Sequence, residues 1–299
     1  MSRSQANILL LLVAVIWGSA FVAQSVGMSA MGPLSFTGVR FLMGALVVTP
    51  LMWREWLGLQ SLGKSIGKAD VLQIAGLGIL LALGALLQQI GIVHTTVTNA
   101  GFLTSLYVPL VPVLGWLLLN HKPHWSVWPS TAACLYGAYL LAGVETLAIN
   151  AGDVWVLAST IPWALHVLLV GGVAHRMSAP FIVAGGQFLV CGLVALIWAL
   201  GFESFTFHSI QIAMGPLLYT GVISVGVAYT AQVVAQRYAH ASDAAIVLSS
   251  ETLFAALFGF LWMNERLNSS GILGCALIFS SMLAVQLLPL LDRKKPLTV

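Results

Sequence analysis

The stretch "TNAGFLTSLYVPLVPVLGWLLLNHK", Thr98 to Lys122, has a counterpart later in the chain, "SDAAIVLSSETLFAALFGFLWMNER", Ser242 to Arg266. A shift of 144 residues, from 98 to 242, aligns them and pairs Ser105 with Ser249 and Asn120 with Asn264. The same shift pairs Asn99 with Asp243, Ala100 with Ala244 and Gly115 with Gly259. Similar shifts match Trp17 with Trp163 and "GVRFLMGALV" from Gly38 with "GGQFLVCGLV" from Gly185. The chain therefore contains the same unit twice.

The composition excludes an ordinary soluble protein. The 299 residues are 59% hydrophobic and only 7% charged, with a mean hydropathy of +0.97, whereas a soluble domain is roughly one quarter charged. A helix needs about 20 mostly apolar residues to cross a bilayer core about 30 Å thick. The chain offers that length repeatedly, as long continuous runs rather than the ten-residue alternating segments of a β-barrel.

Ten transmembrane helices are expected, which makes the fold class an all-α integral membrane protein. The first run follows Arg3 and also resembles a signal peptide, but it continues beyond a short apolar core without a clean cleavage site, which favours an uncleaved span. The ten expected spans are Ile8 to Met28, Pro33 to Trp53, Val71 to Ile92, Ala100 to Leu119, Val127 to Val144, Val154 to Gly172, Pro180 to Leu200, Ile212 to Ala235, Ala244 to Met263 and Gly271 to Leu291.

The basic residues predict the orientation, because Lys and Arg gather on the cytoplasmic side of membrane proteins. With the N-terminus inside, only Arg266 lies in an outer segment and only Arg40 lies within a span. The basic residues of the cytoplasmic segments are then Arg3, Arg54, Lys64, Lys68, Lys122, Arg176, Arg237, Arg293, Lys294 and Lys295. We expect a multi-pass protein of the inner (plasma) membrane with both termini in the cytoplasm. The net charge of +3 follows from this bias and needs no nucleic-acid partner.

The two copies are expected to insert with opposite orientations. Each holds five spans, in residues 1–147 and 148–299, and an odd number of spans reverses the second copy relative to the first. Inverted repeats of this kind are typical of secondary transporters, which present a site near the membrane midplane first to one side and then to the other.

Several short motifs in both copies resemble the EamA-type repeats of the drug/metabolite transporter superfamily. They are Trp17 to Ser19, Arg40 with Phe41, the run from Ser242, Glu251, and Asn264 to Arg266, and the resemblance extends from about Leu9 to Leu288. It implies a cavity formed mainly by the first, third, fourth, sixth, eighth and ninth helices, and export of small metabolites, often amino acids. Thr252 stands where the family often has Pro, which leaves the shape of the ninth helix open, and Asn264 stands where it often has Gly.

Glu251 is the leading candidate for a functional site, because ionisable groups within a membrane are rare and usually functional. It lies about 10 Å into the ninth span at 1.5 Å per residue. There it is a candidate proton carrier or a carboxyl group that is hydrogen-bonded between helices. Arg40, on the second span, reaches a similar depth in the opposite half of the bilayer, so the two are not expected to pair. Because the family places that helix at the periphery of the cavity, a gating or structural role is predicted for Arg40 and its repeat partner Gln187.

Amides and aromatic rings complete the expected site. The 144-residue shift pairs Gln88 with Gln232, and Gln89 lies beside Gln88; these amides either bind a solute across a cavity or join helices to one another. Trp17 and Trp163 lie inside their spans rather than at the interfaces, so their indoles are candidates for a cavity wall. The remaining candidate contacts are Tyr107, Tyr219, Tyr229 and His166, the last being either a ligand or a packed core histidine.

These residues favour a transporter of small amphiphilic or zwitterionic solutes. Aromatic rings with amides and few fixed charges suit such solutes and do not suit phosphate esters, which need Arg or Lys. We expect export of amino acids, aromatic or large neutral ones, by alternating access. The alternatives are a multidrug or a nucleoside or sugar transporter of the same fold and, from another class, an intramembrane hydrolase using Ser19 and His166.

No cofactor is expected. No metal site is expected either, because Cys134, Cys191 and Cys275 lie in separate spans and the "HKPH" loop at His121 supplies only two ligands. The protein is predicted to contact the lipid bilayer and its substrate and to act as a monomer or weak dimer.

Overall fold

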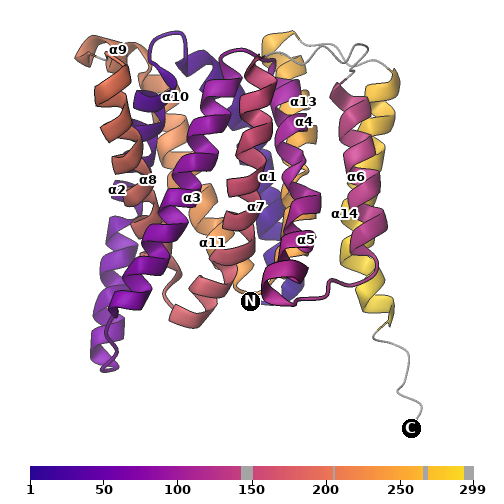
Figure 1. Cartoon of the computed structure of the whole chain (residues 1–299), viewed down its shortest axis with the longest axis horizontal. Helices are drawn as coiled ribbons and strands as arrows, with labels where there is room; N and C mark the ends of the chain where they lie inside the picture. Colours follow the sequence, from indigo (N-terminus) through magenta and orange to yellow (C-terminus); the bar gives the residue numbers. More distant parts are fainter. Residues whose placement is uncertain (143–150, 205, 265–268, 293–299) are drawn as a thin grey trace.

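The structure, a computed structural model, describes residues 1–142, 151–204, 206–264 and 269–292. The predicted domain boundary at 147/148, Val144, Arg266 and the basic residues at 293–295 lie outside these ranges. Helices account for nearly all of the described chain (Figure 1). Those of the first half are α1 (Arg3–Gly27), α2 (Pro33–Ser61), α3 (Lys68–Ile92), α4 (Val97–Ser105), α5 (Tyr107–Leu119) and α6 (Val127–Ala142).

The second half contains the same series with one heavily modified member. Its eighth span is a composite of α10, a π-helix η1 and α11, and π-helical turns are rare and frequent at functional sites. The elements are α7 (Ala151–Met177), α8 (Pro180–Phe202), α9 (Phe207–Ile212), α10 (Met214–Leu218), η1 (Tyr219–Tyr229), α11 (Thr230–Gln236), α12 (Ala241–Leu248), α13 (Glu251–Met263) and α14 (Ser269–Asp292).

In the described part of the chain, nine of the ten expected spans are long and apolar enough to cross a membrane. They are α1, α2, α3, α7, α8 and α14, together with the composites α4–α5, α10–α11 and α12–α13. The expected fifth span corresponds to α6, of which 16 residues are described. The prediction of an all-α multi-pass membrane protein is confirmed.

The two halves are arranged in opposite directions. Helix α1 begins at the end of the bundle where α14 finishes, whereas α7 begins at the opposite end (Figure 1); we call these the α1 end and the α7 end. Equivalent helices pack on each other across the halves, α2 on α8 and α6 on α14. In the same way α3 packs on α7, and its counterpart η1–α11 packs on α1. Each half therefore completes the core of the other.

The fourth and ninth spans are both interrupted, at positions related by the same 144-residue shift. In the first half Pro109 lacks the N–H that would bond the carbonyl of Ser105, so α4 ends there. The second half has no proline at this place, but the hydroxyls of Ser249 and Ser250 donate to Ile246 O and Val247 O, both 2.7 Å away. These side-chain bonds compete with the helical ladder. The question that Thr252 raised is thus answered: the ninth span breaks just before it.

Both broken spans end in the same way. Asn120 follows α5 with φ 53° and Asn264 follows α13 with φ 57°, each in the left-handed conformation that closes a helix. Gly and Asn are the residues that adopt it at least cost. The Asn264 departure from the family pattern is therefore conservative.

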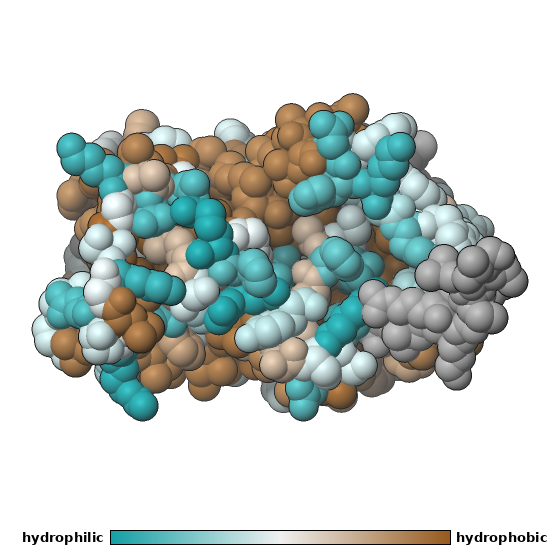
Figure 2. Space-filling view, turned by 90° about the horizontal axis from the view of Figure 1, so that it is seen from below, coloured by the Kyte–Doolittle hydropathy of each residue, from teal (hydrophilic) through white to brown (hydrophobic). Residues whose placement is uncertain are grey.

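The surface matches a membrane environment. Seen from the α1 end, hydrophilic side chains are spread across the face and hydrophobic ones lie along the flanks (Figure 2). Large apolar side chains stay exposed there, among them Leu46, Leu72, Ile197 and Leu200. In water such an apolar flank would promote aggregation, whereas in a bilayer it meets lipid.

Candidate substrate cavity

A cavity lies at the centre of the bundle, where the two halves meet. Its walls come from α1, α2, α3, α4, α5 and α7 together with η1, α11 and α13. The lining residues are Trp17, Ala20, Phe21, Gln24, Arg40, Gln88, Thr104, Tyr107, Trp163, Val167, Ser224, Tyr229, Gln232 and Glu251. The helices that the family resemblance implied all contribute, and α2 contributes as well.

One face of α1 forms a wall of this cavity. Trp17, Ala20, Phe21 and Gln24 follow the i, i+3, i+4, i+7 spacing of a single helix face. Gln24 was not among the predicted site residues. The signal for it was in the sequence: an amide two helical turns beyond Trp17, within an apolar span.

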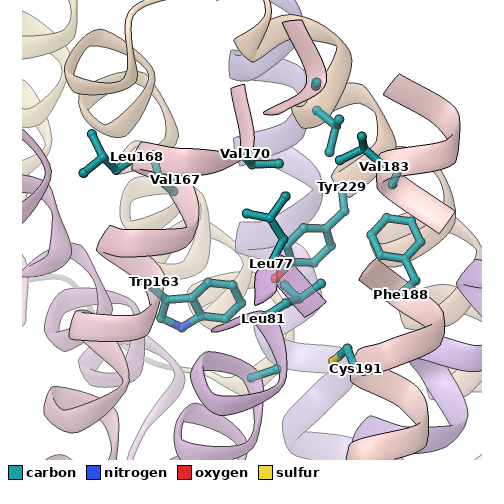
Figure 3. Close-up of a cluster of buried hydrophobic side chains, with 14 of the residues drawn as sticks. Leu77, Leu81, Trp163, Val167, Leu168, Val170, Val183, Phe188, Cys191 and Tyr229 are labelled. Atoms are coloured by element: carbon teal, nitrogen blue, oxygen red, sulfur yellow. The ribbon is translucent and has the colours of Figure 1, made fainter. Parts of the chain in front are cut away.

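Aromatic rings form one side of the cavity. The Tyr229 ring lies 4.4 Å from that of Trp17 and 6.2 Å from that of Trp163, between centroids, and is nearly parallel to the latter at 17°. Figure 3 shows Tyr229 between Trp163 and Phe188. Gly84 makes room for the Trp163 indole, since a Cβ there would lie 2.9 Å from the ring. Trp17, Trp163, Tyr107 and Tyr229 thus line the cavity, and their binding of substrate stays a prediction.

Amides lie on the cavity wall in both halves. Gln88 donates from Nε2 to the Thr104 hydroxyl at 2.9 Å, which leaves its carbonyl oxygen available. Gln232 lines the cavity too, and its Oε1 has no hydrogen-bond partner among the described residues. Gln89 is fully buried and lies away from the cavity lining, with neither amide atom hydrogen-bonded in the described structure.

Arg40 lies on the cavity wall rather than at the periphery where sequence reasoning expected it. Its Nη1 donates to Gln24 Oε1 at 2.7 Å, and its guanidinium carbon is 5.1 Å from the centre of the Phe41 ring. The long side chain carries the charge from α2 across to α1, so the depth of its Cα did not show where the charge lies. The cavity lining thus includes one basic side chain, within the few fixed charges expected from the sequence.

Glu251 lines the same cavity and is the first residue of α13, directly after the interruption. Its side chain is buried, yet no donor within the described ranges is hydrogen-bonded or ion-paired to its carboxyl group. The structure thus gives no support to a carboxyl group that is hydrogen-bonded between helices. The Glu251 carboxyl group lies on the cavity wall without a polar partner in the described structure.

Three other predicted site residues lie elsewhere. His166 is fully buried and its Nε2 pairs with Gln187 Oε1 at 2.9 Å, away from the cavity. This contact joins α7 to α8, which agrees with a structural role for Gln187. Tyr219 pairs through its hydroxyl with Ser19 and does not line the cavity. The described residues contain no cluster of three or more metal-ligating side chains.

The cavity is nearly closed in this conformation. It leaves about 40 Å³ for the centres of water molecules, room for about three of them. Two larger hollows, of about 760 and 660 Å³, open at the α1 end and share His121, Leu168, His240 and Ala241. The cavity residue Gln232 and the hollow residue Gln236 are one helical turn apart, about 6 Å along α11. On α7, Val167 lines the cavity and the next residue, Leu168, lines both hollows.

Comparison with known proteins identifies the architecture. The sequence profile of the EamA-like transporter family matches residues 4–143 and again 150–287. The chain belongs to this family. An uncharacterized transporter of Archaeoglobus fulgidus is 30% identical over 95% of this chain and 87% of its own length. The uncharacterized transporter YoaV of Bacillus subtilis is 25% identical, over 89% and 91%.

A solved structure agrees with this EamA-like fold. A crystal structure of 16% identity covers 96% of this chain and 98% of its own, with a TM-score of 0.76. The protein is thus a membrane transporter built from two EamA-like halves, of the drug/metabolite transporter superfamily. A transporter of this kind moves a small molecule, and the hydrolase alternative is excluded because the family is not one of enzymes.

Proposed function

We propose that this EamA-like transporter exports amino acids, preferably aromatic or large neutral ones, by alternating access. The observation that carries the proposal is the central cavity, which combines the rings of Trp17, Trp163 and Tyr229 with the amides of Gln88 and Gln232. Aromatic walls bind an apolar side chain, and a small number of convergent polar groups fix its orientation. An amino acid presents these two chemistries at its opposite ends.

The charges in the cavity favour a neutral solute over a phosphate ester. Arg40 supplies one basic group and Glu251 one acidic group. A phosphate carries about two negative charges and needs an excess of cationic side chains. A cavity with balanced charges supports an amino acid better than a sugar phosphate or a nucleotide sugar.

Alternating access is supported by the inverted arrangement of the halves and by the closed cavity. The space for about three waters is far below the roughly 300 Å³ of an ordinary ligand pocket, so a solute enters only when the helices move. With the α1 end in the cytoplasm, as the basic residues indicate, the two hollows face the side from which an exporter loads. The cavity forms within a single chain, which supports a monomer as the working unit.

The proposal is tested by uptake of radiolabelled amino acids into liposomes that contain the purified protein. We expect saturable uptake of phenylalanine, tryptophan or leucine, and its loss in the double variant Trp17→Ala, Trp163→Ala. The variant Trp53→Ala is the matched control, because that indole is exposed on the flank of α2. Uptake of nucleosides, sugars or cationic drugs with no amino acid transported would overturn the proposal and select one of the alternatives of the same fold.

A further inference from the structure

The central cavity contains a positive group that no carboxylate of the described chain neutralises. Arg40 is 3% exposed. Its only hydrogen bond in the described structure runs from Nη1 to Gln24, and its Nε has no partner. An uncompensated buried charge is strongly destabilising, and inside a membrane such a group marks a functional site.

Gln24 holds this guanidinium in a fixed position. Its Nε2 donates to Ala20 O at 3.1 Å, which directs Oε1 to Arg40 at 2.7 Å. Ala20 and Gln24 are themselves part of the cavity wall on α1. Gln24 therefore positions Arg40 and satisfies only one of its five N–H groups, while the described residues provide no acceptor for Nη2.

The same cavity contains an equally unpaired carboxyl group. Glu251 is 5% exposed and is neither hydrogen-bonded nor ion-paired within the part of the chain that the structure describes. The two groups come from different halves of the protein, Arg40 from α2 and Glu251 from α13, and both line the cavity together with Tyr229. A basic and an acidic group that share one cavity without pairing can each bind one end of a ligand that carries both an anionic and a cationic group.

Resting on the proposed function, we infer that Arg40 and Glu251 together recognise the two charges of a zwitterion. Arg40 binds the carboxylate through the fork geometry that guanidinium groups offer. Glu251 binds the ammonium group, and the rings of Trp17 and Tyr229 on the same cavity wall offer it cation–π contacts. The apolar side chain of the solute lies against the Trp163 ring.

This arrangement selects against solutes that carry only one of the charges. An amine without a carboxylate leaves Arg40 unpaired in the closed cavity, and an acid without an ammonium group leaves Glu251 unpaired. A site built to bind a polar group rejects the analogue lacking it strongly, because the buried partner then loses its hydrogen bonds. Discrimination of at least about tenfold against each analogue is expected.

The experiment compares phenylalanine with phenethylamine, which lacks the carboxylate, and 3-phenylpropionate, which lacks the ammonium group. Each is measured as a competitor of labelled phenylalanine uptake into proteoliposomes and as a stabiliser of the purified protein against heat. For the wild type we expect both analogues to compete at least about tenfold more weakly than phenylalanine. Arg40→Gln is expected to remove the preference for phenylalanine over phenethylamine. Glu251→Gln is expected to remove the preference for phenylalanine over 3-phenylpropionate.

Conservative variants keep the test informative if a neutral one does not fold. Glu251→Asp retains the carboxyl group and should retain the discrimination to within a few fold. Arg40→Lys retains the charge without the fork, so it should discriminate against the amine more weakly than the wild type and more strongly than Arg40→Gln. The matched controls are Arg176→Gln, half exposed at the α1 end, and Glu55→Gln, which lies outside the cavity lining and accepts the backbone N–H of Ile182 at the start of α8. Both controls should leave the order of the three ligands unchanged.

The outcomes separate this inference from the proposed function. Transport of phenylalanine with equal competition by all three ligands, or an equal loss for all three in each variant, overturns the zwitterion site and leaves amino acid export standing. Thermal stabilisation by phenylalanine alone, without transport of any amino acid, overturns export and retains the site. Absence of both transport and stabilisation overturns the two together.

Discussion

At the scale of single residues, Gly84 determines where a wall of the cavity can lie. A Cβ at this position would approach the Trp163 ring to 2.9 Å, and such overpacking costs about 1–3 kcal/mol. Because the indole is flanked by α3 and Tyr229, the strain of Gly84→Ala is expected to displace it into the small cavity. We predict a roughly tenfold fall in the rate of solute uptake, measured in proteoliposomes.

The control for this change is Gly58→Ala. Gly58 lies in α2, and a Cβ built there meets nothing within 4 Å. Alanine is favoured over glycine within a helix by about 0.5–1 kcal/mol, so this variant should be at least as stable as the wild type and equally active. Equal uptake by both alanine variants would contradict the role assigned to Gly84.

Glu203 acts at the start of α2 although it belongs to the other half of the chain. Its two carboxylate oxygens accept the backbone N–H groups of Leu34 and Ser35, both at 2.8 Å. Helix N-termini have unpaired N–H groups and a positive dipole end, so a carboxylate cap is worth about 1 kcal/mol. Glu203→Ala is predicted to lower the thermal unfolding midpoint in detergent by a few degrees, and Glu203→Gln to lower it by less.

Residue depth was predictable from the sequence, but the direction of a side chain around its helix was not. Trp163 and His166 are three residues apart, which separates them by about 60° around α7. The cavity lies on the side of Trp163 that Val167 shares, and His166 points to Gln187 on α8. Which neighbour packs on which side depends on tertiary contacts, and the apolar pattern of a membrane helix carries little information about them, because lipid and protein interior are both apolar.

At the scale of the helices, one contact occurs twice through the inverted repeat. Asp243 on α12 forms an ion pair with Arg3 at the start of α1, with Nη2 and Oδ2 2.7 Å apart. Its repeat partner Asn99 on α4 donates to Asp153 Oδ1 at the start of α7, also at 2.7 Å. The first contact closes α1 onto α12 at the α1 end, and the second closes α7 onto α4 at the α7 end.

These two contacts predict that two similar mutations accelerate hydrogen exchange at opposite ends of the bundle. A charge-assisted hydrogen bond is worth about 1.5–3 kcal/mol, so its loss raises local opening roughly tenfold or more. Asp243→Asn should accelerate hydrogen exchange in the first turns of α1 and α12. Asp153→Asn should do so in α4 and α7, both followed by mass spectrometry of the purified protein.

Asp70→Asn controls for the loss of a carboxylate at the α1 end. Asp70 pairs with Arg176 at 2.9 Å, and this ion pair links α3 to α7, with the Arg176 side chain 50% and the Asp70 side chain 21% exposed. Ion pairs that are accessible to solvent contribute at most about 1 kcal/mol. Its exchange pattern should resemble that of the wild type. The interpretation fails if Asp243→Asn and Asp153→Asn loosen the same end of the bundle.

The existence of the helices was more predictable than their interruptions. Apolar length alone located the spans, since a bilayer requires it. The break of the ninth span depends on which hydroxyls bond to the backbone at Ser249 and Ser250, and the π-helical form of η1 depends on its packing against α1 and α2. Neither feature has a strong sequence signal, although Pro109 of the first copy indicates the equivalent position in the second copy at which an interruption is expected.

At the scale of the whole molecule, the two ends of the bundle differ. The hollows of about 760 and 660 Å³ open at the α1 end, and most basic side chains of the described chain gather there, including Arg3, Lys122 and Arg176. The positive-inside rule predicts that this end lies in the cytoplasm. The direction of loading proposed above therefore depends on the orientation of the whole protein in the membrane.

That orientation is tested by labelling single cysteines in a variant without Cys134, Cys191 and Cys275. Lys64 and Thr206 are both exposed and lie at opposite ends of the bundle, beyond α2 and before α9 (Figure 1). A membrane-impermeant maleimide added to intact cells should label Thr206→Cys, and should label Lys64→Cys only after the membrane is permeabilised. The reverse pattern would place both hollows on the outer side, and the conformation described here would then be one that loads from outside the cell, as in an importer.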